Sequence, residues 1–252
     1  MITIETEDPM EPIERAREFA RRLEEIYGEE LVSVVLYGSA ARGDYREGVS
    51  DLNLLVLLRA VNPSVLHRGT EIAREWAAQR NPPPLMFSEA EWRASADVFP
   101  IEYSDMRDAH VVLHGLDPFE GLHIDWEHLR LNCEHELKSK LIQLREQYLL
   151  LADDPQGLGQ MLTRSFPTFL TLFRAGLRLA GESAPRDSDV TIAAVAAHAG
   201  FDPAAFQEVL AARSRGAELS PAADDPVVTG YLTSVSRATA WLDGLQAPST
   251  SA

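Results

Sequence analysis

The chain has 252 residues, of which 45% are hydrophobic and 25% charged, values that are typical of a folded, water-soluble protein and exclude a disordered or membrane-embedded one. Its length allows one large domain or two smaller ones, each with its own core. The 39 acidic and 23 basic residues give a net charge of −16, which repels phosphate backbones and argues against nucleic acid or anionic lipid as a general partner. A cationic substrate is compatible with this charge.

Cysteine content and the N-terminus indicate a cytoplasmic protein. Cys133 is the single cysteine, so it cannot form an internal disulfide, which favours a reducing compartment. Residues 1–12 are acidic and lack the basic segment and apolar run of a secretory signal. No run of ~18 apolar residues occurs, so neither a transmembrane helix nor a membrane partner is expected.

The first half of the chain mixes helix and strand patterns. Apolar residues at three- and four-residue spacing predict an amphipathic helix over 12–27 that ends at Gly28. β-branched and leucine-rich runs predict two buried strands. These strands span 31–37 and 51–58, and similar patterns predict a helix over 64–79 and short strands at 85–88, 98–104 and 110–114. We therefore expect a mixed sheet flanked by helices.

The second half has helical periodicity throughout. Short polar loops separate its apolar stripes, which is typical of antiparallel neighbours in a helical bundle. The predicted helices span 126–151, 158–180, 189–199, 203–213 and 226–245. Pro167 is expected to kink the second of them. Residues 247–252 are small and polar, and predict a disordered tail.

Two features of the first half indicate chemistry. Gly38 and Ser39 follow a predicted strand, where glycine lets a phosphate approach the backbone and the serine hydroxyl can donate to it. Asp51 and Asn53 stand two apart on the next strand, so their side chains share one face and can ligate a hard cation. Taken singly, each feature also fits an ordinary tight turn, but the combination favours a phosphate and metal site.

This combination resembles the signature of the nucleotidyltransferase family related to DNA polymerase beta. The matching residues are Gly38, Ser39, Arg42, Gly43, Ser50, Asp51 and Leu54. The resemblance implies an α+β nucleotidyltransferase domain over residues 1–120. The helical half, residues 121–246, is similar in layout to the bundle of kanamycin-nucleotidyltransferase-like proteins.

The resemblance implies that Mg²⁺ ions assist transfer of a nucleoside monophosphate, AMP from ATP, to a hydroxyl of a small molecule or protein. Gly38, Ser39 and Arg42 would hold the phosphates of this nucleoside triphosphate, and Asp51 would be the first metal ligand. The second ligand position holds Asn53, which can coordinate Mg²⁺ through a neutral oxygen but contributes no charge.

The resemblance implies two further contributions. A third carboxylate is expected on a later strand, where Glu102 alternates with Phe99, Ile101 and Tyr103 and would serve as a metal ligand and general base. Lys140 could reach the triphosphate, although an ion pair with Glu136 one helical turn earlier explains it equally well.

Several alternatives stay open. Asn53 weakens the metal site, so the protein could instead bind a nucleotide as a sensor, or act as an antitoxin-like interaction protein. Arg130 and His135 match the spacing of a ribonuclease motif, but five helical positions turn the two side chains ~140° apart. The acceptor, possibly cationic, is not specified by the sequence. Phe166, Phe169 and Phe173 suit either a core or a homodimer interface.

Overall fold

The computed structural model describes residues 11–45 and 50–246, which form two compact units. Residues 1–96 and 109–122 fall in the first unit, and residues 97–108 and 123–252 in the second. Because the expected tail, 247–252, lies outside the described residues, its predicted disorder stays a prediction.

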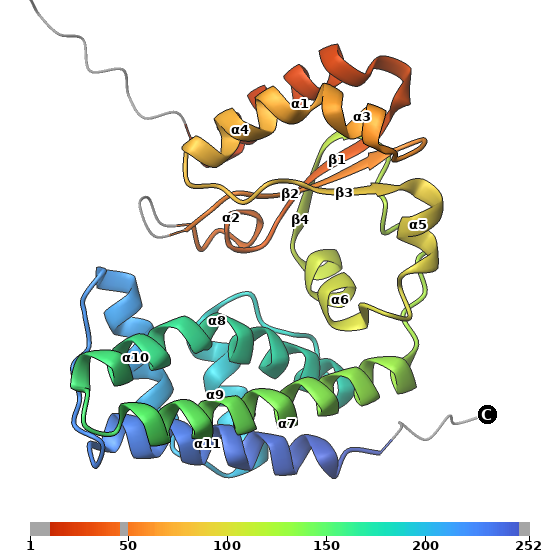
Figure 1. Ribbon diagram of the computed structural model, residues 1–252. Helices are drawn as coiled ribbons and strands as arrows, with labels where there is room; N and C mark the ends of the chain where they lie inside the picture. The colour runs from red at the N-terminus through yellow and green to blue at the C-terminus, as the bar shows by residue number, and fades with distance from the viewer. Residues whose placement is uncertain (1–10, 46–49, 247–252) are drawn as a thin grey trace, which may run out of the picture. The chain divides into compact units, whose positions relative to one another are not determined.

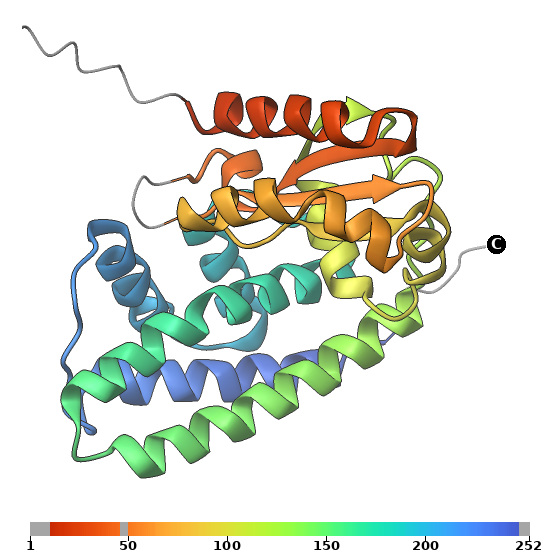
Figure 2. The same ribbon diagram turned by 45° about the horizontal axis from the view of Figure 1, so that its top comes forward.

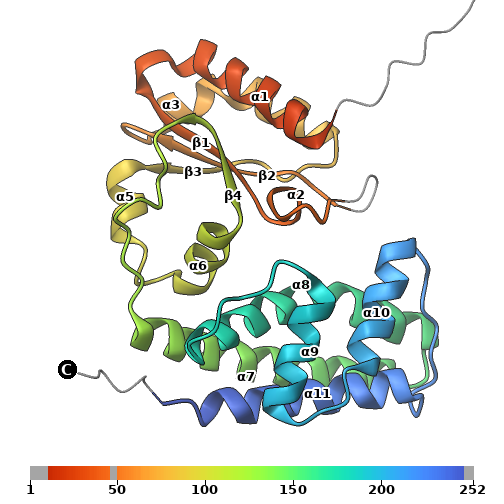
Figure 3. The ribbon, with the colours of Figure 1, turned by 180° about the vertical axis from the view of Figure 1, so that it is seen from behind.

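The first unit is built on a four-stranded mixed sheet of order β3-β2-β1-β4. Strand β1 pairs antiparallel with both β2 and β4, and β2 pairs parallel with β3 (Figure 3). The strands are β1 (Leu31–Tyr37), β2 (Asn53–Leu58), β3 (Leu85–Ser88) and β4 (His110–Gly115). This architecture confirms the predicted mixed sheet.

Helices α1 (Pro12–Tyr27) and α4 (Thr70–Ala78) cover one face of this sheet (Figures 1 and 2). The apolar stripe of α1 buries Phe19 against Trp76 of α4, with ring centroids 4.4 Å apart. Below them, Leu36 pairs with Leu54 in the core that α1, α4 and the strands share. Since side chains alternate along a strand, their neighbours Tyr37 and Asn53 belong to the opposite face of the sheet.

Short elements complete the first unit. Gly69 divides the helix predicted over 64–79 into α3 (Pro63–Arg68) and α4. The 3-10 turn η1 (Gly28–Glu30), α2 (Ser39–Arg42) and α5 (Glu89–Ala94) were not predicted. A capping box between Ser88 and Glu91 starts α5 directly after β3.

The strand predicted over 98–104 is wrong, because residues Pro100–Asp108 form helix α6 of the second unit. The alternation of Phe99, Ile101 and Tyr103 imitates a strand. Pro100, however, opens the helix at a position where its missing N–H costs nothing, and Phe99 lies outside the core, with 44% of its surface exposed. Glu102 therefore lies on an exposed helical position rather than on a sheet edge.

The second unit is a bundle of helices whose core runs through all of its long members. Its further helices are α7 (Trp126–Leu151), α8 (Pro155–Leu179), α9 (Ser188–Ala199), α10 (Ala204–Arg215) and α11 (Pro226–Asp243). In Figure 3, α9 and α10 cross the long helices α7 and α11 rather than run along them. Helix α8 continues through Pro167. Across residues 11–45 and 50–246, no helix is both long and apolar enough to cross a membrane.

Aromatic residues fill the bundle core. Phe166, Phe169 and Phe173 are buried there, which answers the choice between core and interface for these three side chains. Phe206 of α10 stacks on Tyr231 of α11 with ring centroids 4.1 Å apart. The stacking fixes the short α10 against the long α11.

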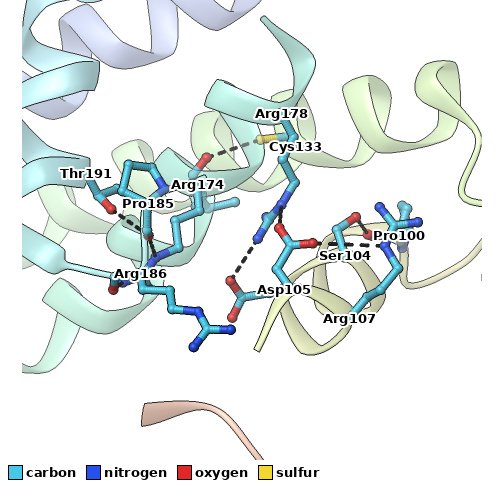
Figure 4. A network of polar contacts seen from close by, with 12 residues as sticks. Pro100, Ser104, Asp105, Arg107, Cys133, Arg174, Arg178, Pro185, Arg186 and Thr191 are labelled. Atoms are coloured by element: carbon cyan, nitrogen blue, oxygen red, sulfur yellow. Dashed lines mark hydrogen bonds and ion pairs between the residues drawn. The ribbon is translucent and has the colours of Figure 1, made fainter. Parts of the chain in front are cut away.

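A buried arginine fastens α6 to the bundle. Arg178 of α8, 9% exposed, donates to Asp105 at 3.3 Å (Figure 4). It also donates to Asp108 at 2.6 Å. On the same helix, Arg174 donates to the carbonyl oxygens of Pro185 and Arg186, which holds the loop between α8 and α9. Helix α6 is thus part of the bundle by ion pairing as well as by packing.

Candidate functional site

The candidate site lies where β1 ends and β2 begins, on adjacent antiparallel strands. Tyr37, the last residue of β1, is paired with Asn53, the first residue of β2. Gly38 follows with φ of +82°, a left-handed conformation that favours glycine. A Cβ atom on Gly38 would lie 3.4 Å from the amide nitrogen of Asn53. A larger residue here would be strained by the positive φ and would contact Asn53.

The chain turns from β1 through the four-residue helix α2. The N–H of Arg42 donates to the Gly38 carbonyl at 3.1 Å, and the N–H of Asp44 donates to the Ser39 carbonyl at 2.9 Å. Gly43 ends α2 with φ of +90°. These contacts hold Ser39 and Arg42 in one compact turn beside Asn53.

Asp51 and Asn53 interact directly. The amide nitrogen of Asn53 donates a hydrogen bond to Asp51 Oδ1 at 3.0 Å. Asp51 is exposed and Asn53 is half-buried. The two side chains thus lie together as predicted, although Asp51 precedes β2 and is not part of the strand expected over 51–58. Because the amide nitrogen faces the carboxylate, the amide group must turn before its oxygen can ligate a cation beside Asp51.

Asn81 supports this pair and was missed by the sequence interpretation. Its Oδ1 accepts the backbone N–H of Leu52, the residue between Asp51 and Asn53, at 3.0 Å. The side chain is 5% exposed. Arg80 precedes it with φ of +66°, and three prolines follow. The sequence signal for Asn81 is its position directly before a proline run, a pattern that is equally typical of a helix end.

Tyr37 also belongs to the site. Burial first, and then the negative charge of Asp51, raise the pKa of Tyr37 to about 12. The neutral phenol is therefore the form present at pH 7. His110 of β4 is paired with Tyr37 on its other side, and its Nε2 lies 3.2 Å from Asp117 Oδ2. His110, Tyr37 and Asn53 thus form one row across three strands.

Two predicted site residues, Glu102 and Lys140, belong to the helical unit. The pKa of Glu102 is raised, mainly because surrounding protein displaces water and then because Glu136 and Asp105 add negative charge. The Nζ atom of Lys140 lies 3.4 Å from Gln143 Oε1. Within 11–45 and 50–246, Lys140 forms no ion pair, so the expected pair with Glu136 is absent.

The ribonuclease-like spacing does not form a paired site. Arg130 binds Glu134 at 2.9 Å and Glu127 at 3.6 Å, whereas His135 lies 3.5 Å from Glu136. The arginine and the histidine thus contact different carboxylates, as their angular separation on a helix predicts.

The donor set near Asp51 fits one magnesium ion better than two. The described residues contain no cluster of three or more histidine, cysteine, aspartate or glutamate side chains that could hold a metal. One carboxylate and one amide oxygen nevertheless match the hard oxygen donors that Mg²⁺ accepts, and protein sites for Mg²⁺ often supply only one or two carboxylates beside substrate phosphates.

The mixed sheet, the Gly38-Ser39 turn and the neighbouring Asp51 and Asn53 form an arrangement that can accept a phosphate and a hard cation. Residues 16–115 match the family model of the nucleotidyltransferase domain. This match confirms the family expected from the glycine-serine and serine-aspartate motifs.

A solved structure extends the likeness beyond the matched domain. Spectinomycin adenyltransferase AAD(9) from Enterococcus faecialis, solved with ATP and spectinomycin, is 15% identical, covers 90% of this chain and 98% of its own, and gives a TM-score of 0.52. This likeness shows a shared fold. A toxin-antitoxin structure with AMP-PNP is 14% identical over 52% of this chain and 95% of its own, with a TM-score of 0.30 that is too low to support an argument. No curated protein sequence matches the chain.

Proposed function

We propose that this protein transfers a nucleoside monophosphate, AMP from ATP, to a hydroxyl of a small molecule or protein. The hydroxyl oxygen bonds to the α-phosphorus and loses its proton, and the bond to the β-phosphate breaks, so that pyrophosphate leaves. The observation that carries the proposal is the Gly38-Ser39 turn beside the paired Asp51 and Asn53, within a nucleotidyltransferase domain. The ATP-bound adenyltransferase of the same fold supports the choice of nucleotide.

Each residue of the turn has a role that follows from its position. Gly38 leaves room for a phosphate next to the backbone, and Ser39 offers a hydroxyl donor at the same place. Arg42, in the same short helix, adds positive charge for the phosphate oxygens. Together they would hold the triphosphate at the end of β1.

Asp51 and Asn53 would hold Mg²⁺ with the nucleotide. The ion, when bound, stabilises negative charge on the phosphate oxygens during transfer. Asp51 supplies the negative charge for the ion, and Asn53 supplies a neutral oxygen once its amide has turned. Asn81 would keep the two ligands in place through Leu52. Glu102 has no role in this proposal, because its assignment relied on a strand that is a helix.

A second candidate function is nucleotide binding without transfer. Asn53 favours it, because one carboxylate attracts Mg²⁺ less strongly than two and leaves the phosphate charge less compensated. In this case the Gly38-Ser39 turn still holds the triphosphate, and the consequence of binding is a signal or a protein contact.

Transfer of label from ATP labelled at the α-phosphate separates the two candidates. Wild-type protein is incubated with Mg²⁺ and with neutral, cationic and anionic hydroxylated compounds, and labelled products are resolved by chromatography. We expect a labelled product that falls at least ~100-fold in Asp51→Asn, a loss of about 2.7 kcal/mol in transition-state stabilisation. Glu71→Gln removes an exposed carboxylate from the first turn of α4 and should retain transfer. Binding of ATP with Mg²⁺ but no labelled product would support the second candidate.

A further inference from the structure

A groove of about 560 Å³ lies between α7 and α8, within the helical unit. The second half of α7 forms one wall and the first half of α8 forms the other. Its volume falls within the range of small-molecule sites. The nucleotide site proposed at Gly38, Ser39, Arg42, Asp51 and Asn53 uses none of the residues that line it. Lys140, which the sequence suggested as a triphosphate ligand, is one of the lining residues.

Side-chain amides dominate the walls of the groove. Four of the chain's seven glutamines line it: Gln143, Gln147, Gln156 and Gln160. They are spaced four residues apart on each helix, so each pair stands one turn above the other on the groove side. All four are exposed. An amide both donates and accepts hydrogen bonds, which suits a ligand with several hydroxyl groups.

The charge within the groove is opposite to that of the protein. Lys140 and Arg164 bring two positive charges, against the single carboxylate of Asp154. That carboxylate already accepts the N–H of Gly157 at 3.0 Å as the cap of α8. Arg164, as far as the described part of the chain extends, forms no ion pair. Two available cations in a chain of net charge −16 indicate an acidic ligand.

The floor of the groove is apolar. Leu144, Met161 and Phe169 line it and are buried in the bundle core. The small part of each that stays exposed gives the groove an apolar contact beside the amides and cations. A carbon chain or sugar ring with hydroxyl groups matches this combination.

We propose that the α7–α8 groove binds a small hydroxylated molecule that carries an acidic group, either a carboxylate or a phosphate. Binding is independent of the proposed transfer. Only the further role of this molecule as the hydroxyl acceptor rests on the proposed function. The acceptor class is then anionic, in contrast to the cationic acceptor suggested by net charge.

Calorimetric titration of the full chain without nucleotide tests the proposal. The probes are D-gluconate, D-glucose 6-phosphate, D-glucose, D-glucosamine and inorganic phosphate. We expect gluconate, glucose 6-phosphate or both to bind at least ~10-fold more tightly than glucose and glucosamine. Whichever of the two acidic probes binds more tightly shows whether the groove prefers a carboxylate or a phosphate. Inorganic phosphate should bind more weakly than glucose 6-phosphate, because it lacks the sugar ring and the hydroxyl groups that would contact the apolar floor and the amides.

Matched variants locate the binding. Arg164→Gln should weaken binding of the anionic probe at least ~10-fold. Arg145→Gln, on an exposed position of α7 outside the groove, should leave the affinity for this probe unchanged. Asp51→Ala should also leave it unchanged, which separates this claim from the nucleotide site. Lack of binding by both anionic probes, tighter binding of glucosamine, or equal binding by wild type and Arg164→Gln would overturn the proposal.

Discussion

The side-chain oxygen of Asn81 accepts the backbone N–H of Leu52 at 3.0 Å, although the two residues are 29 positions apart. Leu52 stands between Asp51 and Asn53, so one buried hydrogen bond fixes the backbone that presents both candidate ligands. The candidate site therefore depends on Asn81. No motif spacing in the sequence links Asn81 to Asp51 and Asn53.

Replacing Asn81 should damage both stability and binding. Asn81→Ala leaves the buried N–H of Leu52 without a partner, which costs about 1–3 kcal/mol of unfolding free energy. It should also weaken ATP binding with Mg²⁺, because Asp51 and Asn53 lose their fixed backbone. Chemical denaturation and calorimetry measure the two effects.

Asn62 offers a matched control, since its side chain accepts the N–H groups of Ser64 and Val65 at the start of α3. Asn62→Ala should cost about 1 kcal/mol of stability without changing nucleotide binding. If both variants bind nucleotide as wild type does, Asn81 has no positioning role.

Asn53→Asp should make folding stability depend on Mg²⁺. Without the ion, two carboxylates replace an amide-carboxylate hydrogen bond, and their repulsion should lower unfolding free energy by about 1 kcal/mol. With Mg²⁺, two charges attract the cation, so the thermal midpoint should rise more than it does in wild type. Thermal unfolding with increasing Mg²⁺ measures this shift.

The exchange variant Asp51→Asn with Asn53→Asp restores one carboxylate and one amide, so its midpoint without Mg²⁺ should return toward that of wild type. An unchanged response of Asn53→Asp to Mg²⁺ would place the cation elsewhere.

Tyr37 reports the charge at Asp51. Its raised pKa of about 12 should fall toward 10 in Asp51→Asn, because the second cause of the shift is removed while burial remains. Carbon-13 NMR of labelled tyrosine rings follows the titration, and Tyr37→Phe assigns the signal. An unchanged Tyr37 pKa in Asp51→Asn would show that the two groups are not close.

This shift also determines how Tyr37 affects stability with pH. The unfolded chain releases the phenol proton near pH 10 and the folded chain only near 12, so unfolding is favoured as pH rises through this window. Wild type should therefore lose more stability between pH 10 and 12 than Tyr37→Phe does. Equal losses in the two proteins would contradict the assignment of the raised pKa.

Arg178 should contribute to the folding stability of the helical unit through its ion pairs with α6. Arg178→Met removes the buried partner of Asp105 and Asp108 and should cost about 3 kcal/mol of unfolding free energy. Asp108→Asn, at the more exposed end, should cost under about 1 kcal/mol. Denaturant unfolding compares the two variants, and similar small losses would show that the ion pairs do not fasten α6.

Local patterns predicted most of the fold because local physics determines it. The three- and four-residue spacing of apolar side chains predicts α1. The apolar run that ends at Gly38 predicts β1 and the turn after it. Helix α6 was missed because Phe99, Ile101 and Tyr103 alternate like a strand, while the contact between Asp105 and Arg178 that fastens the helix joins distant residues. Asn81 was missed because its contact with Leu52 also joins residues that are distant in the sequence.

We propose that Asp51, Asn53 and the Gly38-Ser39 turn bind a nucleoside triphosphate with Mg²⁺. Calorimetric titration of ATP, with and without Mg²⁺, on wild type and Asp51→Ala tests it most directly. We predict binding to wild type only when Mg²⁺ is present, and at least ~10-fold weaker binding to Asp51→Ala. Absence of binding to wild type, or equal binding to both proteins, would contradict the claim.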